Sequence, residues 1–68
     1  MKEIDKLAYE HMSPVREVTY VLRKRLKEAG HIYTTAQVRA AMKRLEQAGL
    51  ITRKGVPQYG GMYCWSKT

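Results

Sequence analysis

The feature of the sequence that most constrains its fold is a helix start at Thr34. Residues 34–37 are Thr-Thr-Ala-Gln, the spacing of a capping box, in which the first and fourth side chains each bond the other residue's backbone N–H. Tyr33 and Val38 stand at the positions of a hydrophobic staple around this start. The helix should end at Gly49, which suits the left-handed residue after a helix. The predicted buried face consists of Val38, Ala41, Met42 and Leu45.

Two more helices are predicted before this one. The first runs from about Lys2 to His11, where apolar residues keep a helical spacing. The second starts at Ser13-Pro14, because Ser13 can cap a helix and Pro14 suits its first position, and it ends at Gly30. The expected buried residues are Ile4, Leu7, Ala8 and His11 in the first helix, and Val15, Val18, Leu22, Leu26 and Ala29 in the second.

A β-hairpin is predicted after the third helix. Its strands are Leu50–Lys54 and Met62–Ser66, and the seven residues between Lys54 and Met62 include three glycines and one proline. Alternation of Tyr63 and Trp65 should turn one aromatic face of the second strand toward the helices. The segment His31–Tyr33 is also rich in strand formers and predicts either an extended turn or a one-bridge strand.

The chain has 68 residues, which predicts a single domain, residues 1–68, with little room for a catalytic cleft. Three helices followed by a two-stranded hairpin make a mainly α fold of the α+β class. No paired carboxylates, Ser/His/Asp set or phosphate-binding glycine loop is evident, so we expect neither an enzyme nor a cofactor. His11, His31 and Cys64 lack the spacing of a zinc site, so no metal is expected and His11 is interpreted as a packing residue.

The sequence also favours a cytoplasmic location. Residues 1–12 alternate charged and apolar side chains, unlike a signal peptide, and no apolar run reaches the length of a membrane span. Cys64 has no partner for an intramolecular disulfide, which is compatible with a reducing compartment. No membrane partner is therefore expected.

Positive charge is concentrated in the later part of the chain. The net charge is +7, from 13 Lys and Arg against 6 Asp and Glu. Residues 1–20 carry three bases and four acids, which sum to −1, whereas residues 21–68 carry ten bases and two acids, which sum to +8. Such a segment suits phosphates or an anionic membrane. The second helix places several of these side chains on one side, as either a phosphate-contacting edge or a solvated face: Arg16, Arg23, Lys24 and Lys27, with Tyr20 among them.

Residues 34–53, TTAQVRAAMKRLEQAGLITR, resemble the recognition helix and first wing strand of winged helix-turn-helix regulators, including MarR-like and small fimbrial-operon regulators. Such regulators commonly show the rhythm V-x-x-x-l-x-x-L-x-x-x-G-l-I-x-R, and the resemblance covers roughly residues 15–66. It implies a winged helix-turn-helix fold whose third helix lies in the major groove of double-stranded DNA while the wing touches the adjacent backbone or minor groove. It further implies transcription regulation in the bacterial cytoplasm or nucleoid. A homodimer, formed through the first helix, follows by analogy, because one recognition helix buries too little surface for high specificity.

The outer face of the third helix agrees with this resemblance. Arg39 can bond the O6 and N7 atoms of guanine, and Ala40 permits close approach to a base edge. Lys43 and Arg44 are expected to meet phosphates. The alternative is an exposed helix filled with good helix formers. The whole outer face is Ala36, Arg39, Ala40, Lys43 and Gln47, with Arg44 at its flank.

Further DNA contacts are expected from the start of this helix. Thr34, Thr35 and Gln37 lie where free backbone N–H groups favour a phosphate. Gln37 ranks below Arg39 as a specificity residue, because a side chain that closes the capping box cannot also bond a base.

The wing supplies the remaining predicted contacts. Arg53 and Lys54 precede the loop, and Gln58 and Tyr59 lie near its tip. Together they could straddle a backbone and enter a minor groove. Tyr59 could instead pack on its own strand.

Two other functions would use the same features. A protein-interaction module of a larger assembly would present the basic face to an acidic partner, and a binder of duplex RNA or left-handed duplex would recognise shape. The polar outer face of the third helix lacks the apolar anchors of interface hot spots, which argues against the first alternative.

Overall fold

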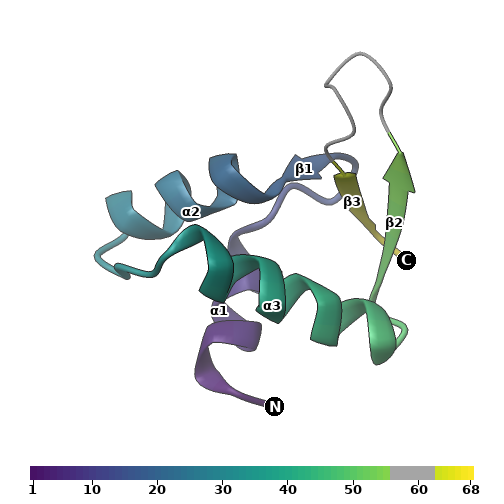
Figure 1. Ribbon diagram of the computed structural model, residues 1–68, viewed down its shortest axis with the longest axis horizontal. Coiled ribbons are helices and arrows are strands. Elements are labelled where there is room, and N and C mark those ends of the chain that lie inside the picture. Colours follow the sequence, from purple (N-terminus) through teal and green to yellow (C-terminus); the bar gives the residue numbers. More distant parts are fainter. Residues whose placement is uncertain (56–62) are drawn as a thin grey trace.

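The computed structural model describes residues 1–55 and 63–68, with Tyr63 described by its backbone only. Its helices are α1 (Glu3–His11), α2 (Thr19–Glu28) and α3 (Thr35–Gln47), and its strands are β1 (Glu17–Val18), β2 (Ile51–Gly55) and β3 (Tyr63–Lys67). The strands pair antiparallel in the order β1–β3–β2. In Figure 1, α2 and α3 lie alongside each other and the sheet stands at one end of the molecule. The expected α+β class is confirmed, whereas the predicted two-stranded sheet is wrong, because the described residues form three strands.

α3 follows its local sequence closely. The backbone N–H of Thr34 donates to Gln37 Oε1 at 2.8 Å, and the N–H of Gln37 donates to Thr34 Oγ1 at 3.1 Å, so both bonds of the capping box form. The four residues of the predicted apolar stripe are all buried. Gly49 has a φ of +79°, in the left-handed region where a side chain would be strained, and the helix ends just before it.

The start of α2 was predicted wrongly. The helix begins at Thr19 and not at Pro14, because the residues before it pair with β3. Glu17 and Val18 lie opposite Trp65 and Cys64 in the sheet. The N–H of Lys67 donates to the carbonyl of Pro14 at 2.9 Å, and Ser66 Oγ donates to the carbonyl of Val15. Residues 14–18 are therefore held against β3 by hydrogen bonds, and the strand β1 occupies the last two of them, where a helix was predicted.

The buried side of α2 changes accordingly. Leu22 and Leu26 are fully buried as predicted, and Thr19 joins them. Val15 is 76% exposed and Ala29 is also exposed, so both were placed wrongly in the stripe. Gly30 has a φ of +93° just beyond the helix, as its predicted role requires.

The hairpin strands lie one residue later than predicted. β2 pairs with β3 so that Ile51 faces Lys67 and Arg53 faces Trp65. Trp65 is buried toward the helices, as expected, but Cys64 on the opposite face is buried too. Residues 31–34 contain neither helix nor strand, so the one-bridge strand is wrong. The predicted loop residues 56–61 lie outside the described part of the chain, as does Met62.

The hydrophobic core lies between the three helices and the inner face of the sheet. Ala8 of α1 and Met12, the residue just after that helix, lie in the core, and Ile4, Leu7 and Tyr9 are partly buried against the same cluster. Leu22, Leu26, Ile51 and Trp65 meet the apolar stripe of α3 there. Because α3 buries one side in this core, its other side remains on the surface.

Candidate nucleic-acid interface

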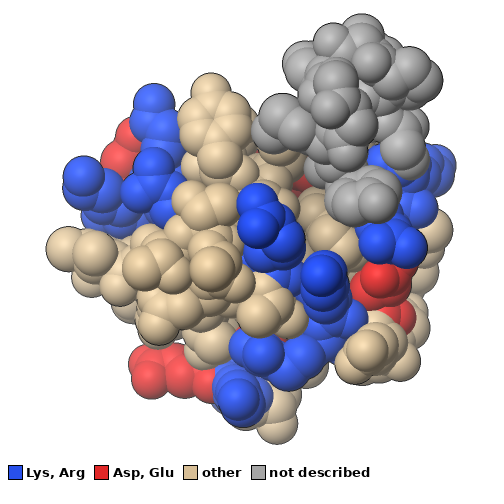
Figure 2. All heavy atoms as spheres, in the orientation of Figure 1, with Lys and Arg blue, Asp and Glu red and all other residues tan. Residues whose placement is uncertain are grey.

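The outer face of α3 carries the cations that the sequence placed there. Arg39, Lys43 and Gln47 are exposed, as is Ala36, and Ala40 is half-buried among them. Figure 2 shows basic side chains along α3 that continue toward β2 on the same face of the molecule. Within the described part of the chain, no ion pair or hydrogen bond engages Arg39 or Lys43. Their charges are therefore available to an anion.

The start of α3 combines capping with exposure. Thr34 and Gln37 are exposed and Thr35 is half-buried. Gln37 Oε1 accepts the bond from the Thr34 backbone, so only the amide NH₂ group of Gln37 is left to donate to a ligand. The conflict expected for Gln37 is thus real, and it ranks below Arg39 as a base-reading residue.

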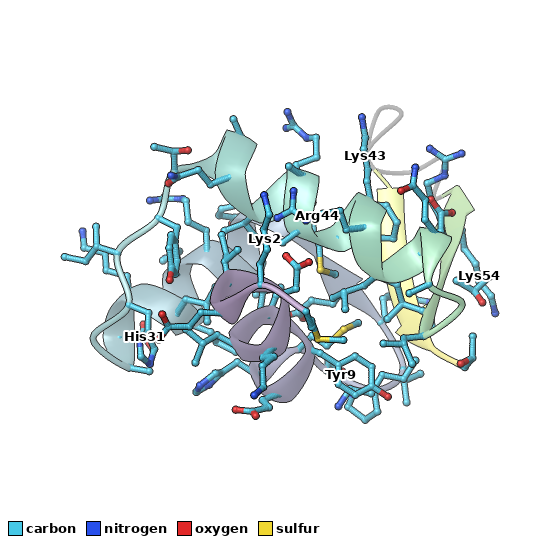
Figure 3. The ribbon with its side chains drawn as sticks, turned by 90° about the horizontal axis from the view of Figure 1, so that it is seen from below. Lys2, Tyr9, His31, Lys43, Arg44 and Lys54 are labelled. Atoms are coloured by element: carbon cyan, nitrogen blue, oxygen red, sulfur yellow. The ribbon has the colours of Figure 1, made fainter. Side chains whose placement is uncertain are left out.

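Arg44 points away from Arg39 and Lys43, the exposed cations of α3. Its Nε lies 2.9 Å from Asp5 Oδ2 and its Nη2 lies 2.8 Å from Asp5 Oδ1, a bidentate ion pair between α3 and α1. Hydrogen bonding to Asp5 raises the pKa of the Arg44 guanidinium. In Figure 3, Lys43 points outward from α3 whereas Arg44 points in a different direction. Arg44 was expected to meet phosphates, but the structure joins it to buried Asp5, so we leave it out of the proposed interface.

The two cations of β2 point to opposite faces of the sheet, because side chains alternate along a strand. Arg53 lies opposite Trp65, and its Nε is 3.6 Å from Glu46 Oε2, at the end of α3. Lys54 lies opposite Cys64, is exposed, and in Figure 3 extends in a different direction from Lys43. The structure therefore brings Arg53, and not Lys54, to the α3 side. The other two predicted wing contacts, Gln58 and Tyr59, lie outside the described residues.

Sequence reasoning missed Asp5, Glu17 and Lys2. The first two are buried carboxylates that pair with arginines of other elements, Asp5 with Arg44 of α3 and Glu17 with Arg25 of α2. Burial raises the pKa of the Glu17 carboxyl, although Arg25 and a backbone hydrogen bond at Ser13 act in the opposite direction. Lys2 is exposed, and in Figure 3 it extends from the start of α1 toward α3. None of these three gives a local sequence pattern, because their neighbours are set by the packing of α1 and β1.

The remaining polar groups of the described residues do not form a metal centre of three or more ligands. The rings of His11 and His31 lie 6.0 Å apart between centroids, which their spacing in the sequence did not reveal. Across residues 1–55 and 63–68, no three or more His, Cys, Asp or Glu side chains come together as metal ligands. In the same residues, no helix has the length and apolar character needed to cross a membrane.

Comparison with known proteins finds no protein-family model, no curated protein and no solved structure that matches the chain.

Proposed function

We propose that this chain is a winged helix-turn-helix domain that binds double-stranded DNA with sequence preference, as a transcription regulator does. The observation that carries the proposal is the outer face of α3, where Arg39 and Lys43 stand exposed and unpaired on a helix whose other side fills the core. An α-helix with its side chains is about 10–12 Å across, and the major groove of B-DNA is about 12 Å wide. The face therefore has the dimensions and the charge that this groove accepts.

Within the groove the side chains take different roles. Arg39 would bond guanine O6 and N7, a contact that discriminates against other bases by about 1–3 kcal/mol. Ala36 and Ala40 keep that part of the helix narrow, so that it approaches base edges and thymine methyl groups closely. Lys43 would bond a phosphate, which positions the helix without reading sequence.

The order of the elements supports the winged helix assignment. α2 leads through a short link into α3, and β2 and β3 follow as an antiparallel pair. Arg53 lies on the α3 side of that pair, so it would reach the backbone beside the groove. The third strand, β1, adds to the edge of the same sheet and leaves the order of the three helices and the hairpin unchanged.

A protein-interaction module is the second candidate. Val15 and Ile32 are 76% and 78% exposed, and neither lies on α3. Exposed apolar side chains of this kind serve more readily in a protein contact than in a phosphate contact. The expected homodimer through α1 has less support, because Ala8 of that helix is buried in the core of the chain itself and Ile4, Leu7 and Tyr9 pack against the same core.

Fluorescence anisotropy tests the proposal, with wild type and Arg39→Ala/Lys43→Ala titrated onto a mixed-sequence DNA duplex over a salt series. We expect salt-dependent binding that the double substitution weakens by at least about fivefold. Lys6→Glu is the matched control, since it removes the same two units of charge at an exposed position of α1. Binding that is absent at low salt, or equally weakened by the control, would reject α3 as the DNA-binding helix and favour a protein partner. Equal affinity for an RNA duplex would instead indicate recognition of shape.

A further inference from the structure

Two half-buried histidines lie side by side at the ends of two helices. His11 is the last residue of α1, and His31 lies in the link, residues 29–34, that joins α2 to α3. Their ring centroids are 6.0 Å apart, and their ring planes are inclined at 59°. Figure 3 shows His31 on this link, beyond the end of α2. The sequence contains two histidines in all, so the fold brings together every imidazole of the chain.

The backbone fixes His31 in this position. The N–H of Gly30 donates to the carbonyl of Lys27 at 3.0 Å. The N–H of His31 donates to the carbonyl of Leu26 at 2.7 Å. These two bonds, with Gly30 at a φ of +93°, form a Schellman motif, which folds the residue after the glycine back toward the last turn of the helix. His31 is therefore held in place before any ligand arrives.

The same motif ends α3, with a different kind of residue at the equivalent position. The N–H of Gly49 donates to the carbonyl of Glu46 at 3.0 Å, and the N–H of Leu50 donates to the carbonyl of Leu45 at 3.1 Å. Leu50 packs against the hydrophobic core, as is usual for the residue after the glycine. At the end of α2 this residue is instead an imidazole beside a second imidazole. The turn itself does not require a histidine there.

The charge around the two rings is compatible with a bound cation. Each histidine lies at the C-terminal end of a helix, where the unpaired carbonyl groups favour positive charge. Arg25 approaches the pair, because its Nη1 donates to the carbonyl of His11 at 3.2 Å. The same Nη1 lies 3.0 Å from Oε1 of buried Glu17, so an ion pair offsets the charge of this arginine.

The chemistry of the pair selects a class of metal ion. Imidazole nitrogen binds Zn²⁺, Ni²⁺ and Cu²⁺ well, whereas Mg²⁺ and Ca²⁺ prefer oxygen. With metal–nitrogen bonds of about 2.0–2.1 Å, two imidazoles that share one tetrahedral ion have ring centroids roughly 5 Å apart. Rotation of the two side chains would close the remaining distance of about 1 Å. Two protein ligands leave the other coordination positions to water, so the site is open and exchangeable, unlike a closed structural zinc site.

We infer that His11 and His31 bind one divalent transition-metal ion of the class of Zn²⁺, Ni²⁺ and Cu²⁺, and that this ion joins the end of α1 to the link before α3. The inference does not depend on the proposed DNA binding. Because the two ligands come together only in the folded chain, the bound ion stabilises that state. The sequence predicted no metal here, because the two histidines are not spaced as zinc ligands are and only the fold reveals the second ligand.

Isothermal titration calorimetry tests the inference, with tag-free protein titrated with ZnCl₂, NiCl₂ and MgCl₂. We expect one Zn²⁺ or Ni²⁺ ion per chain and no binding of Mg²⁺. Zn²⁺ at about ten times its Kd should raise the Tm by at least about 5 °C. His11→Asn and His31→Asn should each weaken binding at least about tenfold, because each removes one of the two ligands.

The double variant, His11→Asn/His31→Asn, is the control for metal bound at the N-terminus or at Cys64. Circular dichroism in the presence of a chelator checks that the variants fold. Loss of binding in only one of the two single variants would overturn the inference, because one imidazole would then bind alone. Binding retained by the double variant, or one ion per two chains, would overturn it as well.

Nuclear magnetic resonance of wild type gives a test that needs no substitution. Zn²⁺ should shift the imidazole ¹⁵N signals of both histidines together, with the same dependence on its concentration. Unchanged signals, or a shift confined to one ring, would show that the pair does not share an ion.

Discussion

Two pairs of neighbouring cations show how differently adjacent residues act in this molecule. On α3, Lys43 stands on the outer face while Arg44 joins Asp5 across the seam with α1. On α2, Lys24 is exposed to solvent while Nη1 of Arg25 lies 3.0 Å from Glu17 Oε1 and donates to the carbonyl of His11 at 3.2 Å. Consecutive helical residues are rotated by about 100°. One residue of each pair therefore contacts a neighbouring element, and the other is exposed on the surface. A count of basic residues therefore overstates the charge available to DNA.

The largest expected effect comes from removing the ion pair between Asp5 of α1 and Arg44 of α3. Arg44→Met should lower the Tm by about 10 °C or more, because it leaves the buried Asp5 carboxylate without its bidentate partner. Thermal unfolding followed by circular dichroism measures this change. Asp5→Leu/Arg44→Met should recover most of the loss and bind DNA like wild type. Poor DNA binding by this stable double variant would indicate that Arg44 belongs to the DNA interface after all.

A smaller, pH-dependent effect on stability is expected at Glu17 of β1, which contacts Arg25 of α2. Burial raises the pKa of Glu17 above its ordinary value of 4.5, so ionisation of this carboxyl disfavours the folded state. Its contribution to stability is fully present below pH 4.5 and is lost as the pH rises through the raised pKa. The Tm of wild type should therefore fall relative to that of Glu17→Gln between pH 4.5 and pH 7. Glu10→Gln, an exposed substitution on α1, is the control, and a constant difference for Glu17→Gln over this range would contradict the assignment.

The smallest effect is expected for Arg23, a half-buried cation of α2. Arg23→Leu keeps an apolar side chain and removes the buried Nε that lacks a partner. The free energy of unfolding should stay the same or rise by up to about 1 kcal/mol. Urea unfolding measures this quantity. A loss of stability greater than about 1 kcal/mol would indicate that Arg23, like Arg25 and Arg44, stabilises a contact between elements.

The sequence predicted α3 well because the interactions that define it are local. The capping box joins residues three apart, and the apolar stripe is visible at helical spacing. β1 could not be predicted in this way, since two residues show no alternation and the strand exists only through pairing with β3, near the other end of the sequence. The role of Arg44 was missed for the same reason, because Asp5 lies 39 residues away. Of the proposed DNA contacts, those of Arg39 and Lys43 could be predicted from helical rotation, whereas the side of the sheet on which Arg53 lies depends on the pairing of β2 with β3.

The order of the strands has a consequence for how the chain folds during synthesis. β1 and β2 each pair with β3 and not with one another, so the last strand in the described sequence is the centre of the sheet. The ribosome therefore makes all three helices before any part of the sheet can form. Until Trp65 emerges, the apolar residues that it covers remain open to water. Pairing of β1 with β3 closes a long loop of chain, which is entropically unfavourable and slows folding. The nascent chain should therefore gain its stable native structure only when β3 has left the exit tunnel.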